Sequence, residues 1–224
     1  HRLSLAQSAK EEGYDVIVAT NDSSKLGFVQ NKFMVVEIPF TRSIGGIREE
    51  LRILAALSEC IRKHRPAIVH AVSLKVSILA ALSMWRVRGS ALLCAFTGLG
   101  HLFTSNKFNA KLLRFIVQLT LRLLLSNPNY WCVVQNKEDL ELIQRVRGGD
   151  TTRLLMVPGS GVNTEFFPYS EIPKGKARNV LFPARLLTDK GIQEFVGAAR
   201  CIMSRRSNVE FVIAGGLDPR NPSA

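Results

Sequence analysis

Residues 179–215 read NVLFPARLLTDKGIQEFVGAARCIMSRRSNVEFVIAG, and the pattern of this stretch decides the fold class. Two apolar runs, 179–184 and 209–215, have the length and composition of buried strands. Between them, residues 190–205 place apolar side chains on one face with a period of 3.6, which is typical of an amphipathic helix. A strand, a helix and a second strand in this order form a βαβ unit, whose strands are parallel. The stretch therefore predicts an α/β protein built on parallel sheets.

The same alternation of strands and helices runs through the chain ahead of this unit. Expected strands lie at 15–20, 33–39, 67–72, 90–97, 130–135 and 153–157, and expected helices at 3–12, 47–64, 74–87, 109–125 and 137–146. A segment rich in Gly and Pro, residues 158–178, shows no period and reads as a linker. We therefore expect two doubly wound, Rossmann-like domains, residues 1–168 and residues 169–224.

Both domains look incomplete in the sequence. A doubly wound domain normally opens with a strand, whereas this chain opens within a loop or helix. A single βαβ unit is also too small to cover both faces of its own sheet. We therefore expect a chain truncated at both ends, with the first strand of the first domain ahead of His1 and the second domain cut short.

The composition indicates a globular protein without a metal site or a disulfide framework. The chain has 224 residues, of which 46% are hydrophobic, so a sizeable core can form, and disordered and fibrous classes are excluded. Its four cysteines form no C-x-x-C pair, and its four histidines lack the spacing of zinc ligands. Reduced thiols favour a cytoplasmic protein. The longest apolar run, 112–125, contains two arginines and is too short and too charged to span a bilayer.

The net charge of +12 is concentrated in one part of the sequence. No Asp or Glu lies between Cys60 and Lys137, and this stretch carries eleven Lys and Arg residues. Such segregation predicts a phosphate, a nucleic acid or an anionic membrane surface as partner, the alternative being a solvated basic face. Within the stretch, the expected helix 109–125 mixes Lys and Arg with apolar residues. It suits a membrane surface and equally an ordinary helix whose apolar face is core.

The sharpest chemical signal is the pair Arg185 and Lys190. Arg185 follows the carboxyl end of the expected strand 179–184, which is where open α/β sheets bind ligands. Thr188 or Asp189 can cap the next helix, which would put Lys190 in its first turn. Together with the helix amides, the two cations would form a phosphate clamp. The local pattern fits two surface cations near a helix end equally well.

Two glycine loops and one lysine also follow expected strand ends. Gly98–Gly100 and Gly159–Gly161 let a ligand approach the backbone closely, although neither matches a dinucleotide or P-loop fingerprint. Lys75 opens the helix after the third expected strand, where an anionic substrate would explain a cation at a helix N-terminus. His70, inside that strand, reads as a core histidine. His101, beside the first glycine loop, is an acid/base candidate or simply polar surface.

Four stretches carry a resemblance to a known family. They are VPGSGVNTEFF (157–167), PARLLTDKGIQEFVGAAR (183–200), AGGLDPRNPSA (214–224) and FTGLGHLFT (96–104). In these stretches, and over nearly its whole length, the sequence resembles retaining glycosyltransferases of the two-domain GT-B type, glycosyltransferase family 4. It is most similar to the bacterial members that build lipid-linked oligosaccharides, capsule or O-antigen units, including N-acetylgalactosaminyltransferase-like enzymes.

The resemblance assigns expected roles to residues of this sequence. Arg185 and Lys190 would bind the diphosphate of the donor and stabilise the leaving group. Two loops would complete the donor side. Gly159, Ser160 and Gly161 would form the loop into the interdomain hinge. Asp218 and Asn221 would lie in a second loop near the donor. The acceptor side would be formed by Lys75, Thr97, Gly98, Gly100 and His101.

Two departures from the family pattern limit this transfer of roles. Many members have a catalytic-site histidine at the position of Thr97, so that role is not transferred to His101. The Glu-x7-Glu motif of the family, which contacts the donor sugar and ribose, would lie beyond Ala224. We therefore expect this stretch of chain alone to be inactive.

The resemblance implies a glycosyltransferase that moves a sugar from a nucleotide-diphosphate sugar, taken as a UDP-sugar, to a lipid-linked or polysaccharide acceptor with retention. It implies that no metal and no cofactor takes part. Combined with the basic stretch, it suggests a lipid-diphosphate acceptor and a cytoplasmic protein in peripheral contact with the inner face of the cell membrane through the first domain. No nucleic acid is expected as a partner.

Two other functions are kept open. A nucleotide-sugar epimerase of the GT-B fold would keep the phosphate clamp, but it needs carboxylates in the cleft, and residues 60–137 offer none. A non-catalytic nucleic-acid-binding module would need surface aromatics interleaved with the basic residues, whereas the aromatics here fall mostly in strands and helix cores.

Overall fold

The structure, a computed structural model, describes residues 2–21, 32–41, 46–85, 87, 89–96, 98–99, 108–159, 161–171, 178–205 and 208–217. The chain forms two compact units, His1–Asn163 and Thr164–Ala224. Every pair of neighbouring strands in the described ranges is parallel. The α/β class with parallel sheets, predicted from the βαβ pattern, is therefore confirmed.

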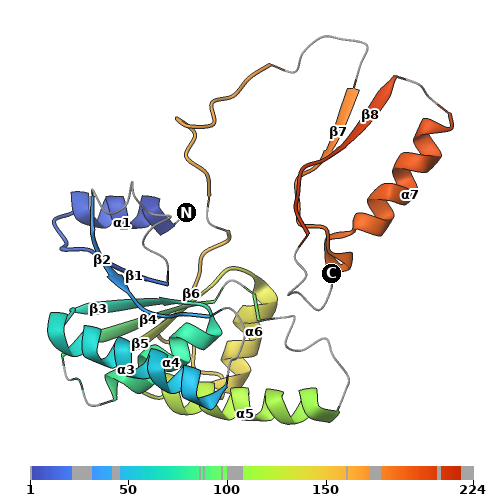
Figure 1. Cartoon of the computed structure of the whole chain (residues 1–224). Helices are drawn as coiled ribbons and strands as arrows, with labels where there is room; N and C mark the ends of the chain where they lie inside the picture. The colour runs from blue at the N-terminus through green and yellow to red at the C-terminus, as the bar shows by residue number, and fades with distance from the viewer. Residues whose placement is uncertain are drawn as a thin grey trace. The chain divides into compact units, whose positions relative to one another are not determined.

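The first unit alternates helices and strands along the chain (Figure 1). Its elements are α1 (Arg2–Glu11), β1 (Ile17–Thr20), β2 (Met34–Glu37), α3 (Ile47–His64), β3 (Ile68–Val72), α4 (Leu74–Met84), β4 (Ala91–Phe96), α5 (Phe108–Leu125), β5 (Tyr130–Val134), α6 (Lys137–Val146) and β6 (Leu154–Met156). Strands β3, β4, β5 and β6 form one sheet in this order, and β1 pairs with β2 in another. All the expected elements are found, with ends that differ by only a few residues.

Helix α3 shows how the sequence directs the packing of this unit. Its buried residues Ile53, Leu57 and Ile61 recur every four positions, so they face one side of the helix and enter the core. The core continues into the middle of the sheet, where Leu92 and Val134 have no exposed surface. Each fully buried aliphatic side chain contributes about 1.5–3 kcal/mol. This packing fixes the strands whose ends carry the predicted site.

A cavity of about 340 Å³ separates β1 from β3. Its lining is mostly apolar and comes from β1, β3, α3 and α4, including Ile17, Leu57 and Val76. Within the described ranges, β1 pairs only with β2 and β3 only with β4, so the strands of the first unit form two separate sheets there. His70 on β3 lines this cavity and is exposed there, so its expected place in the core was wrong.

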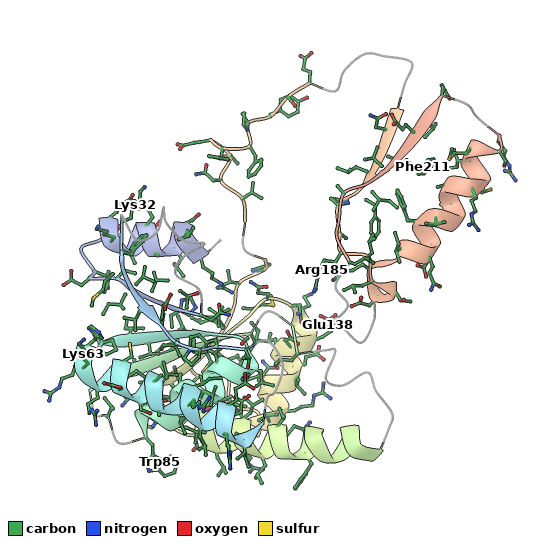
Figure 2. All side chains as sticks on the ribbon, in the orientation of Figure 1. Lys32, Lys63, Trp85, Glu138, Arg185 and Phe211 are labelled. Atoms are coloured by element: carbon green, nitrogen blue, oxygen red, sulfur yellow. The ribbon has the colours of Figure 1, made fainter. Side chains whose placement is uncertain are left out.

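The second unit contains the βαβ stretch that predicted the fold. Strand β7 (Arg178–Phe182) leads through a short 3₁₀ helix, η3 (Thr188–Lys190), into α7 (Ile192–Met203), and β8 (Val209–Ile213) pairs with β7. The ring centroid of Phe195 on α7 lies 5.0 Å from that of Phe182 and 5.6 Å from that of Phe211, which is labelled in Figure 2. Through these ring contacts α7 packs against β7 and β8.

Candidate functional site

The predicted site residues of the first unit gather at one edge of the four-stranded sheet. Because β3 to β6 are parallel, the segments that follow their carboxyl ends meet at the same edge. Lys75 follows β3, Gly98 follows β4, and Gly159 and Gly161 follow β6. The six predicted residues Thr97, Gly100, His101, Ser160, Asp218 and Asn221 lie outside the described residues.

Lys75, in the first turn of α4, is paired with a carboxylate of the protein itself. Its Nζ donates a hydrogen bond to Glu50 Oε1 at 2.6 Å and another to Thr41 Oγ1 at 2.8 Å. The side chains of Lys75 and Glu50 are 18% and 21% exposed, so water screens the pair only in part. An anion for this cation is thus already present, which the sequence argument for an anionic substrate did not anticipate.

Ser73, between β3 and Lys75, holds a backbone conformation that favours glycine. Its φ is 85° and its ψ is 157°, in a region that residues with a side chain rarely occupy. The Ser73 N–H donates to the carbonyl of Ala95 at 3.0 Å, and the Ser73 carbonyl accepts from the Ser77 hydroxyl at 2.8 Å. These bonds hold a strained residue at the ligand-binding edge of the sheet.

Leu99, three residues after the end of β4, is held by a buried carboxylate that was not predicted from the sequence. The backbone N–H of Leu99 donates to both carboxylate oxygens of Asp139, at 3.0 and 3.2 Å. Asp139 lies in the first turn of α6 and is 2% exposed. Asn136, the residue ahead of α6, donates from Nδ2 to Asp139 Oδ2 at 3.0 Å, and it accepts from the Asp139 N–H at 2.7 Å. The spacing of Asn136 and Asp139 indicates a helix start, but it gives no sign of the contact with Leu99.

The segment that carries Arg185 and Lys190 follows the carboxyl end of β7. Leu187, 1% exposed, anchors the segment, while Lys190 and Arg185 are exposed, the latter labelled in Figure 2. Lys190 is the last residue of η3 and not part of the first turn of α7, so its expected position was wrong. Gly191, whose φ of 80° suits glycine, ends η3 and stands directly ahead of α7. Both cations nevertheless lie in one short segment at the ligand-binding end of the strand.

The segment after β8 packs backbone to backbone against this cationic segment. A Cβ on Gly215 would lie 1.8 Å from the carbonyl oxygen of Ala184, so only glycine fits there. The Leu186 N–H also donates to the carbonyl of Gly216 at 3.2 Å. Gly215 thus sets the position of the backbone beside Arg185. Gly215 lies in the stretch 214–224 that carries the family resemblance, but no feature of the sequence indicates this close contact.

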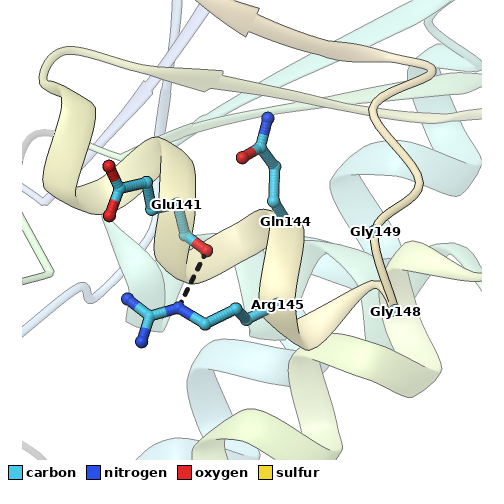
Figure 3. A pocket seen from close by; sticks show the side chains of 5 residues that line it. All are labelled: Glu141, Gln144, Arg145, Gly148 and Gly149. Carbon is cyan, nitrogen blue, oxygen red and sulfur yellow. Dashed lines mark hydrogen bonds between the residues drawn. The ribbon is translucent and has the colours of Figure 1, made fainter.

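A separate hollow of about 510 Å³ lies at the end of α6 (Figure 3). It is lined by Glu141, Gln144, Arg145, Gly148 and Gly149, and Arg145 Nε donates to the carbonyl of Glu141 at 3.2 Å. Helix α6 starts at the carboxyl end of β5 and runs back toward the start of β6. The hollow is therefore at the opposite edge of the sheet from Lys75 and Gly98.

Among the described residues, no three His, Cys, Asp or Glu side chains are grouped so as to hold a metal ion. The chemically distinctive features there are the cationic segment of the second unit and the hydrogen-bonded edge of the first.

The family model and the two curated relatives that match this chain are all described as glycosyltransferases. Residues 1–126 match the family described as glycosyl transferase 4-like. The chain is 26% identical over 219 residues to EpsD of Bacillus subtilis (strain 168), which is named as a glycosyltransferase, and covers 55% of it. It is 29% identical over 138 residues, 56% of this chain, to the N,N'-diacetylbacillosaminyl-diphospho-undecaprenol alpha-1,3-N-acetylgalactosaminyltransferase of Campylobacter jejuni subsp. jejuni serotype O:2 (strain ATCC 700819 / NCTC 11168), and covers 35% of that protein.

A solved structure agrees with the sequence comparisons in fold. The crystal structure of a glycosyltransferase from Rickettsia africae ESF-5 matches 96% of this chain with a TM-score of 0.61 at 14% identity, and the chain covers 63% of it. At this identity the likeness establishes the fold, and the expected GT-B class is confirmed. The chain spans about half or less of the length of the two curated relatives.

Proposed function

The chain belongs to the glycosyl transferase 4-like family, and on this premise we propose that it transfers a sugar from a UDP-sugar to a lipid-linked or polysaccharide acceptor with retention. The observation that carries the proposal is the exposed cationic segment of Arg185 and Lys190 at the carboxyl end of β7. Open α/β sheets bind ligands at this end of their strands. A nucleotide diphosphate is the leaving group of the proposed reaction, and two cations suit its charge.

In this proposal Arg185 and Lys190 offset the negative charge that develops on the departing diphosphate. Fixed charges directed at a leaving group lower the barrier because they interact more strongly with the transition state than with the ground state. The guanidinium of Arg185 can also bind two phosphate oxygens at once. The two side chains supply this charge in our proposal, with no metal or other cofactor. The donor side would also include Gly159–Gly161, Asp218 and Asn221.

We assign the acceptor to the first unit, at the edge that carries Lys75 and Gly98, where Thr97, Gly100 and His101 would also act. The name of the Campylobacter relative describes transfer to a sugar on diphospho-undecaprenol. For this chain we propose an acceptor of the same chemical class, a lipid diphosphate that bears a sugar. Such an acceptor keeps its hydrocarbon in a membrane and presents its polar end to the protein.

A peripheral contact with the inner face of the cell membrane follows from this acceptor, and the surface of the first unit supports it. On α5, Phe115, Leu119 and Leu123 are exposed and recur every four positions, so they form one apolar stripe. Trp85, at the end of α4, is 78% exposed. The stretch 60–137 around them has no acidic residue. Apolar side chains among basic ones suit the surface of an anionic bilayer. No described helix has the length and apolarity to cross a membrane.

Binding of free nucleotides to this chain tests the donor site without requiring turnover. We expect UDP to bind, and Arg185→Ala and Lys190→Ala each to weaken it about tenfold or more, because each removes a charge-assisted hydrogen bond. Arg200→Ala is the matched control, since Arg200 is an exposed cation in the last turn of α7. Unchanged UDP binding in both site variants would overturn the clamp.

The reaction separates the transferase from the two other functions, and it is measured in the full-length protein because this stretch alone is expected to be inactive. With a UDP-sugar donor, a transferase releases UDP only as product appears on a lipid-diphosphate acceptor. An epimerase would convert the donor sugar without any acceptor. Salt-sensitive binding of duplex DNA together with no binding of UDP would favour the nucleic-acid-binding module.

A further inference from the structure

We propose that Asp139 is a positioning residue for the acceptor, which acts by fixing the backbone of Gly98 and Leu99 after β4. This inference rests on the proposed function, because it takes Gly98 and its neighbours as part of the acceptor side. Asp139 itself is buried, so it acts through the backbone of Leu99 and does not touch the acceptor. Nothing in the sequence pattern connects these two residues, which are 40 positions apart.

The loop is held at Leu99 from two sides. The Leu99 side chain is 2% exposed and belongs to the hydrophobic core. Its N–H is bound by both oxygens of Asp139, at 3.0 and 3.2 Å. Gly98, just before it, has a φ of 148°, which a residue with a side chain adopts poorly. The direction in which the chain leaves β4 is therefore set by Asp139 and Gly98 together.

Asp139 is in turn held firmly in its place. A carboxylate taken out of water needs compensating donors, and this one receives the Leu99 N–H and Asn136 Nδ2. It also lies in the first turn of α6, where the helix dipole favours a negative charge. Asn136 closes the arrangement by accepting the Asp139 N–H at 2.7 Å. The start of α6 and the end of β4 thus form one hydrogen-bonded frame.

The hydrogen-bonded frame also includes the turn between β3 and Lys75. The Ser73 N–H donates to the carbonyl of Ala95 at 3.0 Å, which ties the turn after β3 to the last residues of β4. The turn after β3 is therefore hydrogen-bonded to the end of β4, and Leu99, which follows β4, is hydrogen-bonded to Asp139. If the acceptor contacts both, the geometry between them depends on this carboxylate.

The test compares Asp139→Asn with Glu138→Gln in the same chain. Asn keeps the size of the side chain and one oxygen for the Leu99 N–H, but it loses the charge and the second acceptor oxygen. Glu138 is the preceding residue and is exposed, so its variant controls for loss of a charge at the start of α6. Farnesyl diphosphate in detergent is the acceptor probe and UDP is the donor probe. Hydrogen exchange at the Leu99 amide reports on the loop itself.

We expect Asp139→Asn to speed exchange at Leu99 and to weaken farnesyl diphosphate binding about tenfold, the scale of one charge-assisted hydrogen bond, with UDP binding unchanged. Glu138→Gln should change neither the exchange at Leu99 nor the binding of farnesyl diphosphate or UDP. Faster exchange at Leu99 with unaltered farnesyl diphosphate binding would overturn the proposal and leave Asp139 a structural role only. Equal weakening of both probes would overturn it as well, because the effect would then not be confined to the acceptor side.

A failure of the proposed function looks different from a failure of this inference. If the unmodified chain binds neither UDP nor farnesyl diphosphate, the proposed function fails and the inference falls with it. If the unmodified chain binds both and Asp139→Asn binds farnesyl diphosphate normally, only the inference fails. Asp139→Ala, which leaves the buried N–H of Leu99 without an acceptor, should lose stability in addition to acceptor binding.

Discussion

Lys75 Nζ and Glu50 Oε1 lie 2.6 Å apart and join the first turn of α4 to the first turn of α3. The pair stands beside the strained turn of Ser73, at the edge where the carboxyl ends of the parallel strands meet. Glu50 and Asp139 are both outside the acid-free stretch 60–137 in sequence, yet both reach residues inside it. The basic stretch is thus anchored at this edge by two carboxylates that come from its flanks.

Breaking the pair should destabilise the first unit. We expect Glu50→Gln and Lys75→Met each to cost about 1–2 kcal/mol, between the values for exposed and buried ion pairs, because both side chains are mostly buried. Tryptophan fluorescence during denaturation measures this selectively, since Trp85 and Trp131 are the only tryptophans and both lie in the first unit. The double variant should cost less than the two single costs added together, and strict additivity would argue against the pair.

The strain at Ser73 leads to a prediction of the opposite sign. Ser73→Gly should stabilise the first unit by about 1 kcal/mol, because relief of a conformation costing about 1–3 kcal/mol outweighs the extra freedom of glycine in the unfolded chain. Ser73→Ala is the matched control and should change little, since it keeps the strain and no hydrogen bond caps α4 from this side chain. The same fluorescence measurement applies, and a less stable glycine variant would contradict the strain.

Gly215 and Gly216 form a matched pair in the second unit. Gly215→Ala should displace the segment of Arg185, because the added Cβ would meet the Ala184 carbonyl at 1.8 Å and backbone cannot easily yield. We expect a loss of about 2 kcal/mol or more in stability, as for overpacking, and a loss of UDP binding similar to that of Arg185→Ala. Gly216→Ala meets nothing within 4 Å and should behave as the unmodified chain. Circular dichroism and UDP titration give the two readouts, and intact UDP binding in Gly215→Ala would refute the packing argument.

The cysteines should differ in reactivity in an order set by burial. Cys201 is exposed, Cys60 is partly buried, and Cys94 and Cys132 are buried. Burial raises the pKa of the Cys60 thiol, although the charge of Lys63 opposes this. Its reactive thiolate therefore forms at higher pH than that of an unburied thiol. Mass spectrometry after iodoacetamide labelling should show Cys201 modified first and Cys60 second, with the rate at Cys60 still rising above pH 9. Rapid labelling of Cys94 would contradict the packing of β4 against β5.

The fold was largely predictable because period and length are local properties. The βαβ pattern of 179–215 and the alternation ahead of it located every described α-helix and strand. The boundary at Lys190 was missed because a 3₁₀ turn that ends at Gly191 has no distinct periodicity in a stretch so short. The division of the described strands of the first unit into two sheets could not be predicted, because the pairing of strand edges depends on contacts between distant residues.

The site was predictable only in part. Strand-end positions such as Arg185 and Gly98 can be read from the order of elements. The carboxylates at this edge could not be predicted from the sequence. Residues 60–137 contain no acid, and the two carboxylates that bond to this stretch, Glu50 and Asp139, come from outside it. Asp139 is buried and Glu50 is paired with Lys75, so the sequence argument against an epimerase stays a prediction. The family match is the ground for proposing a transferase, and the dependence of UDP release on an acceptor is its test.

The apolar stripe on α5 gives the prediction that bears on the membrane. Replacing Leu119 and Leu123 by Ser should reduce cosedimentation with vesicles of anionic phospholipid about fivefold or more, because both side chains would lie among the lipids when the protein is bound. Stability should change little, since both residues are exposed in the free protein. The matched control replaces Leu3 and Leu5 of α1, which are also exposed, by Ser.

Two further observations make this test specific. Trp85 is near the end of α4 and exposed, so its fluorescence should shift to shorter wavelength when the stripe meets lipid. Added salt should weaken binding to anionic vesicles, because the eleven basic residues of 60–137 contribute through long-range attraction. Binding that is indifferent to salt and to anionic lipid would contradict a role for this charge. Equal losses in the α5 and α1 variants would show that no particular face of the first unit meets the membrane.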